Sequence, residues 1–419
     1  MVPARSTYAV LLHGSRVGTL RQRGDHTQFS FVQEYLETPN RPVLGLRFEE
    51  NLGAPYSAAL RLPRWFSNLL PEGPLRAWIA ADRGVSPDRE MELLAQVGHD
   101  LPGAVQVVQV ESDDETWEPT GRKREQPTPA RSAPESPWRF SLAGVALKFS
   151  MLERGDRLTV PARGENGDWL VKFPDYRFPD VPRNEYAMMS IARDAGLDVP
   201  DVRLVHRDDL EGLPARMWPN DEQWAYAIRR FDRHQDADRT PVHIEDLAQV
   251  RDKYPDAKYE GDFETIAALV YRGRDVRALR EMVRRLAFSI LVGNGDAHLK
   301  NWSLIYPDQR IPTLAPVYDI VSTVAYRSHG GHVEDLGLRF DGSKRFEAVR
   351  LSSFGRLGDR LATRFGAIDA DLVETAATVC DDVMRHWAAH REILAGNTRL
   401  AAEIDGWIRA AQARIRPSR

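Results

Sequence analysis

A short polar segment, GNGDAHLKN (residues 293–301), follows an apolar run and carries groups that phosphoryl transfer requires. Asp296 and Asn301 have the spacing D-x-x-x-x-N, as in the catalytic loop of protein kinases, where the aspartate accepts the substrate hydroxyl proton and the asparagine binds Mg²⁺. Asp319 lies behind a second apolar run, eighteen residues after Asn301. A kinase needs such a second acidic group to bridge Mg²⁺ to the phosphates.

Residues suited to hold a nucleotide precede this segment in the order that a kinase requires. Lys172 lies in WLVKF, a predicted strand, and Glu185 lies on the next predicted helix, where it could pair with that lysine. A predicted turn between strands contains Ser141, Ala143, Gly144 and Lys148. The backbone N–H groups of such a turn can cradle phosphate. The ordered set is more specific than any single member.

Each residue also has a purely structural interpretation. Asp296 and Asn301 could cap a helix or shape a turn, and Lys172 could be a solvated strand residue. A carboxylate such as Glu185 is favoured in the first turn of any helix. His298 could orient Asp296 or satisfy local backbone groups.

Two further residues are interpreted as structural. Asp246, in VHIEDLAQ, is predicted to start a helix, and Cys380 is predicted to lie in a helical core.

The surrounding pattern predicts an α+β protein with a kinase-like, two-lobed fold behind a small α/β N-terminal domain. Residues 1–110 form the first domain, with a hairpin in TYAVLLHGSRVGTL and strands in FSFVQEYL and LGLRF. A loop followed by a helix is predicted in 61–84, and another helix in 91–98. Residues 111–137 are a proline-rich, charged linker. Residues 138–241 form a β-rich lobe and residues 242–419 a helical lobe. Two helices with apolar stripes, at 371–394 and 399–415, end the chain.

Composition restricts the class of protein. The chain has 419 residues, with 57 basic against 61 acidic residues and a net charge of −4, which argues against a protein that coats nucleic acid through bulk charge. Its single cysteine allows no disulfide within the chain. We find neither a signal-peptide pattern nor an apolar stretch that could span a bilayer, so we expect a cytoplasmic protein with no membrane partner.

The chain resembles the HipA toxins, bacterial serine/threonine kinases of HipBA-type toxin–antitoxin modules. The resemblance covers nearly the whole length. It is carried by RLPRWFSNLLPEG and GHDLPGAVQV in the first domain, and by FSLAGVALKFS, WLVKFP, RNEYAMM, AIRRFDR, HIEDLAQ, KYEG, GNGDAHLKNW and PVYDIVST in the kinase part. These motifs occur in the order found in that family.

The resemblance implies a role for each matching residue with ATP and Mg²⁺ as cofactors. Asp296 would be the catalytic base, assisted by His298, and Asn301 and Asp319 would bind Mg²⁺. Glu185 would support Lys172, and Ser141 would be the site of autophosphorylation. The residues that contact ATP would be Ala143, Gly144, Val145, Ala146, Leu147, Lys148, Lys172, Arg229, Arg230, Phe231 and Tyr318.

Two segments depart from the family pattern, and a third departs from the pattern of ordinary protein kinases. Ala146 and Leu147 stand where polar residues or proline are usual, which puts side-chain contacts of the nucleotide loop in doubt. Arg229 replaces a glutamate of the hinge, whose backbone contacts to adenine should survive. Asp319 is followed by Ile320 and Val321 rather than by Phe-Gly.

The resemblance also implies partners: a small helix-turn-helix antitoxin like HipB, operator DNA contacted mainly through that antitoxin, and a protein substrate such as an aminoacyl-tRNA synthetase. Two other functions stay open. The chain could be a nucleotide-binding corepressor without catalysis, although it retains Lys172, Asp296, Asn301 and Asp319. It could also be a kinase for a small molecule or lipid.

Overall fold

The structure is a computed structural model that describes residues 5–110, 148–155, 157–160, 167–213, 218, 220–236, 239–329 and 335–416. The chain divides into two compact units. Unit 1 takes residues from the ranges 1–170, 232–257 and 305–312, and unit 2 takes residues from 171–231, 258–304 and 313–419.

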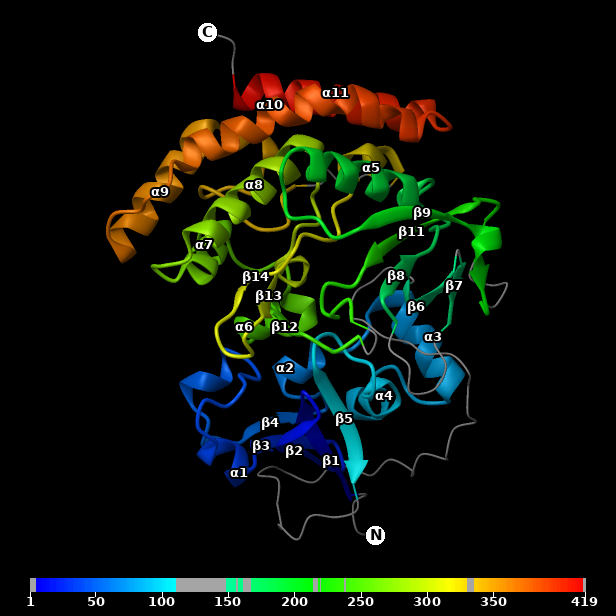
Figure 1. The fold of residues 1–419 in the computed structure, drawn as a ribbon, viewed down its shortest axis with the longest axis vertical. Helices are drawn as coiled ribbons and strands as arrows, with labels where there is room; N and C mark the ends of the chain where they lie inside the picture. Colours follow the sequence, from blue (N-terminus) through cyan, green and yellow to red (C-terminus); the bar gives the residue numbers. More distant parts are fainter. Residues whose placement is uncertain are drawn as a thin grey trace. The chain divides into compact units, whose positions relative to one another are not determined.

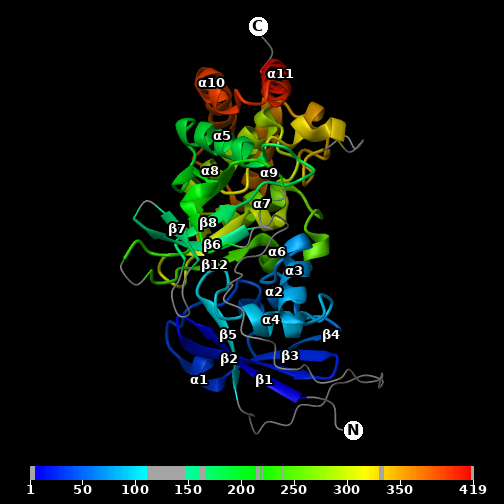
Figure 2. The same cartoon turned by 90° about the vertical axis from the view of Figure 1, so that its right-hand side faces the viewer.

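Unit 1 contains an antiparallel five-stranded sheet (Figures 1 and 2) with the order β4-β3-β2-β1-β5. The strands are β1 (Arg5–Leu12), β2 (Ser15–Arg23), β3 (His26–Phe31), β4 (Tyr56–Ala59) and β5 (Val105–Val110). The predicted hairpin is confirmed: Leu12 pairs with Ser15 across His13 and Gly14. Both turn residues have positive φ, 50° and 77°, as in the tight turn that matches the twist of paired strands.

Four helices accompany this sheet: α1 (Gln33–Glu37), α2 (Arg64–Ser67), α3 (Gly73–Arg83) and α4 (Glu90–Val97). Figure 2 shows α2 and α4 on the same side of the sheet. One strand prediction is right only in its first three residues, and another is wrong. The segment FSFVQEYL leaves β3 after Phe31 and continues as α1, and LGLRF forms a turn that leads into the 3₁₀ helix Phe48–Glu50. Leu44 and Phe48 are both buried, four residues apart, so their apolar spacing also suits a helical turn.

The rest of unit 1 comes from later parts of the sequence. It includes the antiparallel pair β6 (Lys148–Arg154) and β7 (Arg157–Thr159), then β12 (His243–Asp246), α6 (Leu247–Val250) and the 3₁₀ helix Pro255–Ala257. Asp246 starts α6, as predicted, in a capping box with Gln249. An aromatic cluster of Phe29, Phe48, Trp65 and Phe66 is fully buried in this unit.

Unit 2 contains the strands nearest the candidate site. The last two residues of β8 (Trp169–Lys172) belong to it, and β11 (Trp224–Arg229) lies between β8 and β9 (Val202–His206). The short strand β10 (Leu210–Glu211) follows a 3₁₀ turn at Arg207–Asp209. β13 (Ser303–Tyr306), which runs across the division between units, neighbours β14 (Thr313–Leu314). The segment after residue 242 therefore adds short strands to the helices that we predicted there.

The helices of unit 2 are α5 (Val181–Asp194), α7 (Phe263–Tyr271), α8 (Val276–Val292), α9 (Leu351–Phe365), α10 (Leu372–His390) and α11 (Thr398–Ile415). Short 3₁₀ helices occupy Leu299–Asn301, Thr323–His329, Phe346–Ala348 and Arg391–Leu394. α10 and α11 both pack against α8. The predicted stripe on α10 is buried at Leu372, Ala376, Val379, Val383 and Trp387, and Cys380 is buried beside it. Among the described residues, no helix combines the length and apolarity that a membrane crossing requires.

Candidate active site

Lys172, at the end of β8, contacts two carboxylates in unit 2. Its ammonium lies 2.5 Å from Oε1 of Glu185 on α5 and also contacts Oδ1 of Asp319. The side chains of Lys172 and Glu185 are buried, whereas that of Asp319 keeps 29% of its surface exposed. Burial by itself would lower the pKa of Lys172, but the charges of Asp319 and Glu185 raise it overall, so the lysine stays protonated.

A neighbour of Glu185 ties α5 to the segment behind Asp319. The side chain of Asn184 is completely buried. Its Oδ1 accepts the N–H of Ser322 at 3.0 Å, and its Nδ2 donates to the carbonyl of Ser322 at 3.1 Å. Asn184 and Glu185 are consecutive in α5. The two hydrogen bonds of Asn184 to Ser322 therefore help to hold the carboxylates of Glu185 and Asp319 around the ammonium of Lys172.

The backbone of Asp319 has a conformation that is rare for a residue with a side chain. Its φ is +60°, in the left-handed region that L-residues usually avoid. Residues held there cost about 1–3 kcal/mol each and are concentrated at functional sites. The strained position fits a carboxylate that must be aimed in a fixed direction.

The segment 293–301 forms a tight loop after α8. Gly293 ends the helix with φ +69°, and a Cβ at this position would lie 2.2 Å from Val324 Cγ2, so glycine is required there. Asn294 Oδ1 then accepts the N–H of Asp296 at 3.1 Å. The carbonyl of Asp296 accepts Nδ2 of Asn301 at 2.8 Å. The spacing of the motif is therefore the spacing at which Asn301 folds back on Asp296.

The contact between Asn301 and Asp296 also indicates which atom of Asn301 suits a metal ion. The amide nitrogen bonds to the carbonyl of Asp296, which directs the amide oxygen elsewhere. Carboxylate and carbonyl oxygens are the ligands that Mg²⁺ prefers, and Mg²⁺ keeps water or phosphate as its remaining ligands. Within the described part of the chain, no group of three or more His, Cys, Asp or Glu side chains could hold a metal ion. Asn301 and Asp319 each carry a side-chain oxygen of the kind that Mg²⁺ prefers, and they are the candidate ligands.

His298 is buried next to the exposed Asp296. Its Nε2 lies 3.8 Å from Asp296 Oδ1. Burial, followed by the charge of Lys258, lowers the pKa of His298 to about 3, so the imidazole is neutral at physiological pH. We therefore treat the pair as a contact between a neutral ring and a carboxylate rather than as a salt bridge. The charge of Asp319 acts in the opposite direction and raises the pKa of His298, but burial and Lys258 outweigh it.

The segment predicted to bind adenine, residues 229–231, contacts Tyr318, the residue before Asp319. Arg229 ends β11 and donates its N–H to the carbonyl of Asp201 at 2.8 Å, and Arg230 is buried. The rings of Phe231 and Tyr318 have centroids 5.7 Å apart. The Tyr318 hydroxyl donates to the carbonyl of Lys300 at 2.9 Å, so this ring pair is linked to the loop that contains Asp296 and Asn301.

Part of the predicted site lies outside the described residues: Ser141 and the loop residues Ala143, Gly144, Val145, Ala146 and Leu147. Lys148 is described, as a buried residue that begins β6 in unit 1.

Tyr259, in the motif KYEG, contacts the candidate base, and its residue type and spacing do not predict this contact. The Tyr259 hydroxyl donates to Oδ1 of Asp296 at 2.5 Å. The same is true of Asn184, in RNEYAMM, and its contact with Ser322. Both residues contact partners that are distant in the sequence. The only sequence signal for them is that KYEG and RNEYAMM belong to the ordered motifs of the family.

This protein is a kinase by class, as its relatives are. Its unit 2 contains a strand lysine paired with a helix glutamate, a D-x-x-x-x-N loop and a second aspartate. Two family models match the chain: that described as HipA N-terminal domain over residues 8–108, and that described as HipA-like C-terminal domain over residues 140–387. The chain therefore belongs to the HipA family, and the resemblance seen in its motifs is confirmed.

Individual relatives agree with this assignment. A Sinorhizobium fredii protein named "Putative kinase Y4dM" is 39% identical over 418 residues, covering 96% of this chain and 97% of the relative. The serine/threonine-protein kinase toxin HipA of Shewanella oneidensis is 28% identical over 297 residues, 62% of each chain. A solved structure of Shewanella oneidensis HipA with HipB and operator DNA matches with a TM-score of 0.70 at 20% identity, covering 97% of both chains. The predicted α+β, kinase-like fold is confirmed.

Proposed function

We propose that this chain is an ATP- and Mg²⁺-dependent serine/threonine protein kinase that acts as the toxin of a toxin–antitoxin pair. The observation that carries the proposal is the contact of Lys172 with both Glu185 and Asp319, in the same unit as the loop of Asp296 and Asn301. A charged lysine, a carboxylate base and two oxygen ligands for a divalent ion are the parts that phosphoryl transfer requires.

Each residue of the candidate active site has a separate role in the proposed phosphoryl transfer. Bound ATP with Mg²⁺ would supply the phosphoryl group and neutralise part of its charge. Asp296, 51% exposed, would take the proton of the acceptor hydroxyl while the hydroxyl oxygen bonds to the γ-phosphorus. The bond between that phosphorus and the ADP oxygen would break, so that ADP leaves. Asn301 and Asp319 offer the metal ligands, and Lys172 binds phosphate oxygens. Neutral His298 limits the movement of Asp296 without adding a charge.

Other residues are proposed to bind and regulate the nucleotide. The backbone of Arg229, Arg230 and Phe231 would bind adenine, and Tyr318 would contact the nucleotide. The family resemblance assigns the loop of residues 143–148 to the phosphates. Phosphorylation of Ser141 would place a dianion near the triphosphate site and repel ATP.

The partners follow from the family. The solved relative is a complex of HipA with HipB and operator DNA, and we propose a similar helix-turn-helix antitoxin here, with DNA contacted mainly through it. The net charge of −4 suits this indirect approach to DNA. A protein of translation, such as an aminoacyl-tRNA synthetase, is the proposed substrate, and the cytoplasm the proposed location.

Phosphate transfer from [γ-³²P]ATP to protein tests the proposal directly. We expect labelling of serine by the wild-type chain, and a loss of about a hundredfold or more in Asp296→Asn, because general-base catalysis typically contributes 10²–10⁴-fold. Asp359→Asn is the matched control, since Asp359 is an exposed carboxylate on α9, and should label like the wild type.

The outcomes separate the alternative functions. Equal labelling by the wild type and Asp296→Asn contradicts the proposal. Tight ATP binding without transfer would favour the nucleotide-binding corepressor, and labelled small molecules or lipids without labelled protein would favour the third function.

A further inference from the structure

Tyr259 lies at the exposed side of the candidate active site. Its side chain is among the large apolar groups on the surface, with 42% exposure, and its hydroxyl donates to Asp296 Oδ1 at 2.5 Å. A carboxylate that is half exposed can rotate, and a short hydrogen bond to one of its oxygens restrains the carboxylate plane. The contact therefore limits the directions from which Asp296 can accept a proton.

The ring of Tyr259 is itself held by the catalytic loop. It meets the buried ring of His298 edge-on, with centroids 5.0 Å apart, a favourable geometry for two aromatic rings. The carbonyl of the preceding residue, Lys258, accepts the N–H of Leu299 at 3.0 Å. Tyr259 and the loop of Asp296 thus share both a ring contact and a backbone hydrogen bond.

A second segment fixes the backbone of Tyr259 from the other side. Residues 335–345, which we call the support hairpin, fold back on themselves through hydrogen bonds between Leu336 and Lys344 and between Phe340 and Ser343. Lys344 Nζ donates to the carbonyl of Tyr259 at 3.1 Å and to that of Gly337 at 3.2 Å.

The support hairpin also touches the backbone beside Asp296. A Cβ at Gly337 would lie 2.8 Å from the carbonyl carbon of Ala297 and 3.0 Å from the nitrogen of His298. Real Cβ atoms rarely come so close to backbone, so only glycine allows this packing. The hairpin therefore supports both Tyr259 and the residues that follow the catalytic aspartate.

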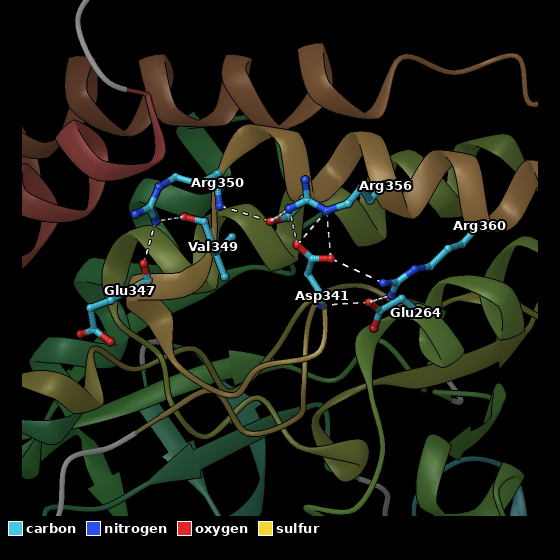
Figure 3. A network of polar contacts seen from close by, with 8 residues as sticks. Glu264, Asp341, Glu347, Val349, Arg350, Arg356 and Arg360 are labelled. Carbon is cyan, nitrogen blue, oxygen red and sulfur yellow. Dashed lines mark hydrogen bonds and ion pairs between the residues drawn. The ribbon is translucent and has the colours of Figure 1, made fainter.

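The far end of the support hairpin is anchored to α7 and α9 (Figure 3). Arg356 Nε donates to both carboxylate oxygens of Asp341 at 3.0 Å, and Arg360 contacts Asp341 and Glu264. The N–H of Asp341 donates to Glu264 Oε1 at 2.9 Å. A network of this kind holds geometry better than an isolated surface ion pair.

Apolar packing strengthens the same anchor. Phe340 is buried between Phe263 of α7 and Phe354 of α9, with ring centroids 6.4 Å and 5.1 Å away. The support hairpin is thus fixed at one end to the helical core and at the other to Tyr259.

We propose that Tyr259 is a positioning residue for Asp296 and that the support hairpin holds Tyr259 in place. This inference rests on the proposed function, because it concerns how the proposed base is oriented. Tyr259 acts through Asp296 and leaves ATP binding to other residues. Its removal should therefore lower kcat and leave the KM for ATP unchanged.

The test compares hydroxyl-deleting variants of two tyrosines in the full-length chain. The probe is [γ-³²P]ATP with Mg²⁺, with transfer measured to the chain itself and to dephosphorylated casein. Tyr259→Phe should lower kcat about tenfold, the effect of losing one hydrogen bond to a charged group, with an unchanged KM for ATP and an unchanged thermal midpoint. Tyr254→Phe is the matched control: it also loses a hydroxyl hydrogen bond, to the carbonyl of Leu62 in unit 1, and should keep the wild-type kcat.

A second variant tests the hairpin. Lys344→Met removes the bonds to Tyr259 and Gly337 and should lower kcat about threefold, again without a change in KM for ATP. Wild-type kcat in Lys344→Met overturns the role of the support hairpin.

The results separate this inference from the proposed function. Absence of labelling by the wild type overturns both. Labelling that Asp296→Asn abolishes, but that Tyr259→Phe leaves at the wild-type rate, overturns the inference alone. A Tyr259→Phe chain with a raised KM for ATP and a normal kcat overturns it too, because Tyr259 would then serve nucleotide binding.

Discussion

Glu245 in unit 1 and Glu185 in unit 2 are both buried, and their carboxyl groups have different surroundings. Glu245 in unit 1 accepts hydrogen bonds from Leu46 N–H at 2.9 Å, from Trp65 Nε1 at 3.1 Å and from the Tyr306 hydroxyl. Glu185 in unit 2 lies against the ammonium of Lys172. Burial raises the pKa of Glu245 to about 7 despite its hydrogen bonds, whereas the carboxylates near Lys172 keep that lysine charged.

Glu245 is a structural acid, whereas Glu185 belongs to the candidate active site. Uncharged N–H and O–H groups from three segments of unit 1 donate hydrogen bonds to the carboxyl group of Glu245. None of these groups carries a charge that could bind a ligand. The group around Lys172 contains an ammonium and two carboxylates, one of them partly exposed. Clusters of perturbed, charged groups mark functional sites. Burial of an acid is therefore less informative than the charge of its partners.

The largest effect on stability should come from breaking the pair in unit 2. Lys172→Met removes the cation beside buried Glu185, and we expect the free energy of unfolding to fall by about 3–5 kcal/mol, the usual result of removing one member of a buried pair. Adding Glu185→Gln should restore a large part of this loss, because the second change removes the buried charge. Urea unfolding of the wild type, both single variants and the double variant measures the coupling. A loss below about 1 kcal/mol in Lys172→Met would mean that water solvates the pair.

The next largest effect concerns the pH dependence of unit 1. The folded-state pKa of Glu245, about 7, lies above its ordinary value of 4.5, so its contribution to stability is complete below pH 4.5 and disappears as the pH rises to 7. Glu245→Gln cannot titrate. The stability of the wild type relative to this variant should fall by up to about 3 kcal/mol across that window.

Unfolding of both proteins at several pH values checks this prediction. Burial lowers the pKa of His243 to about 4 and that of His298 to about 3, so both histidines destabilise the fold as the pH falls below 6.5. Both histidines are present in the wild type and in Glu245→Gln. The difference in unfolding free energy between the two proteins therefore reports the titration of Glu245 alone. A constant difference from pH 4.5 to 7 would contradict the prediction.

The smallest effect should be the same in the two units. Asp246 caps α6 in unit 1, and Asp262 caps α7 in unit 2 by accepting the N–H of Thr265 at 2.7 Å. Replacing either cap by alanine should cost about 1 kcal/mol of unfolding free energy. Thermal unfolding of the two variants gives the comparison. A loss several times larger in one unit would show that its cap supports more than the helix.

The sequence predicted the features that depend on regular spacing. The buried stripe of α10 repeats every three or four residues, so its face could be recognised without knowing what covers it. Lys172 and Glu185 could be paired because each lies on an element predicted from its own neighbours. Asp296 and Asn301 are joined by local backbone, and their spacing therefore defines their contact.

Features that depend on distant contacts could not be predicted in this way. Tyr259 meets Asp296 because Lys344 and Leu299 fix the backbone of 258–259, and no periodicity of the sequence encodes that arrangement. The error at LGLRF has a similar origin. Gly45 packs so closely that a Cβ would lie 2.5 Å from Trp65 Nε1, and this contact favours a turn over the strand that alternation suggests.

Unit 1 is assembled from stretches far apart in the chain, and this has a consequence during synthesis. Trp65 and Tyr306, which both donate to Glu245, are separated by about 240 residues. At typical elongation rates of 5–20 residues per second, the ribosome adds Tyr306 roughly 10–40 s after Val110, the last residue of the N-terminal sheet. Until then the aromatic side chains around Trp65 lack part of their covering, so the nascent chain should depend on chaperones that shield apolar surface.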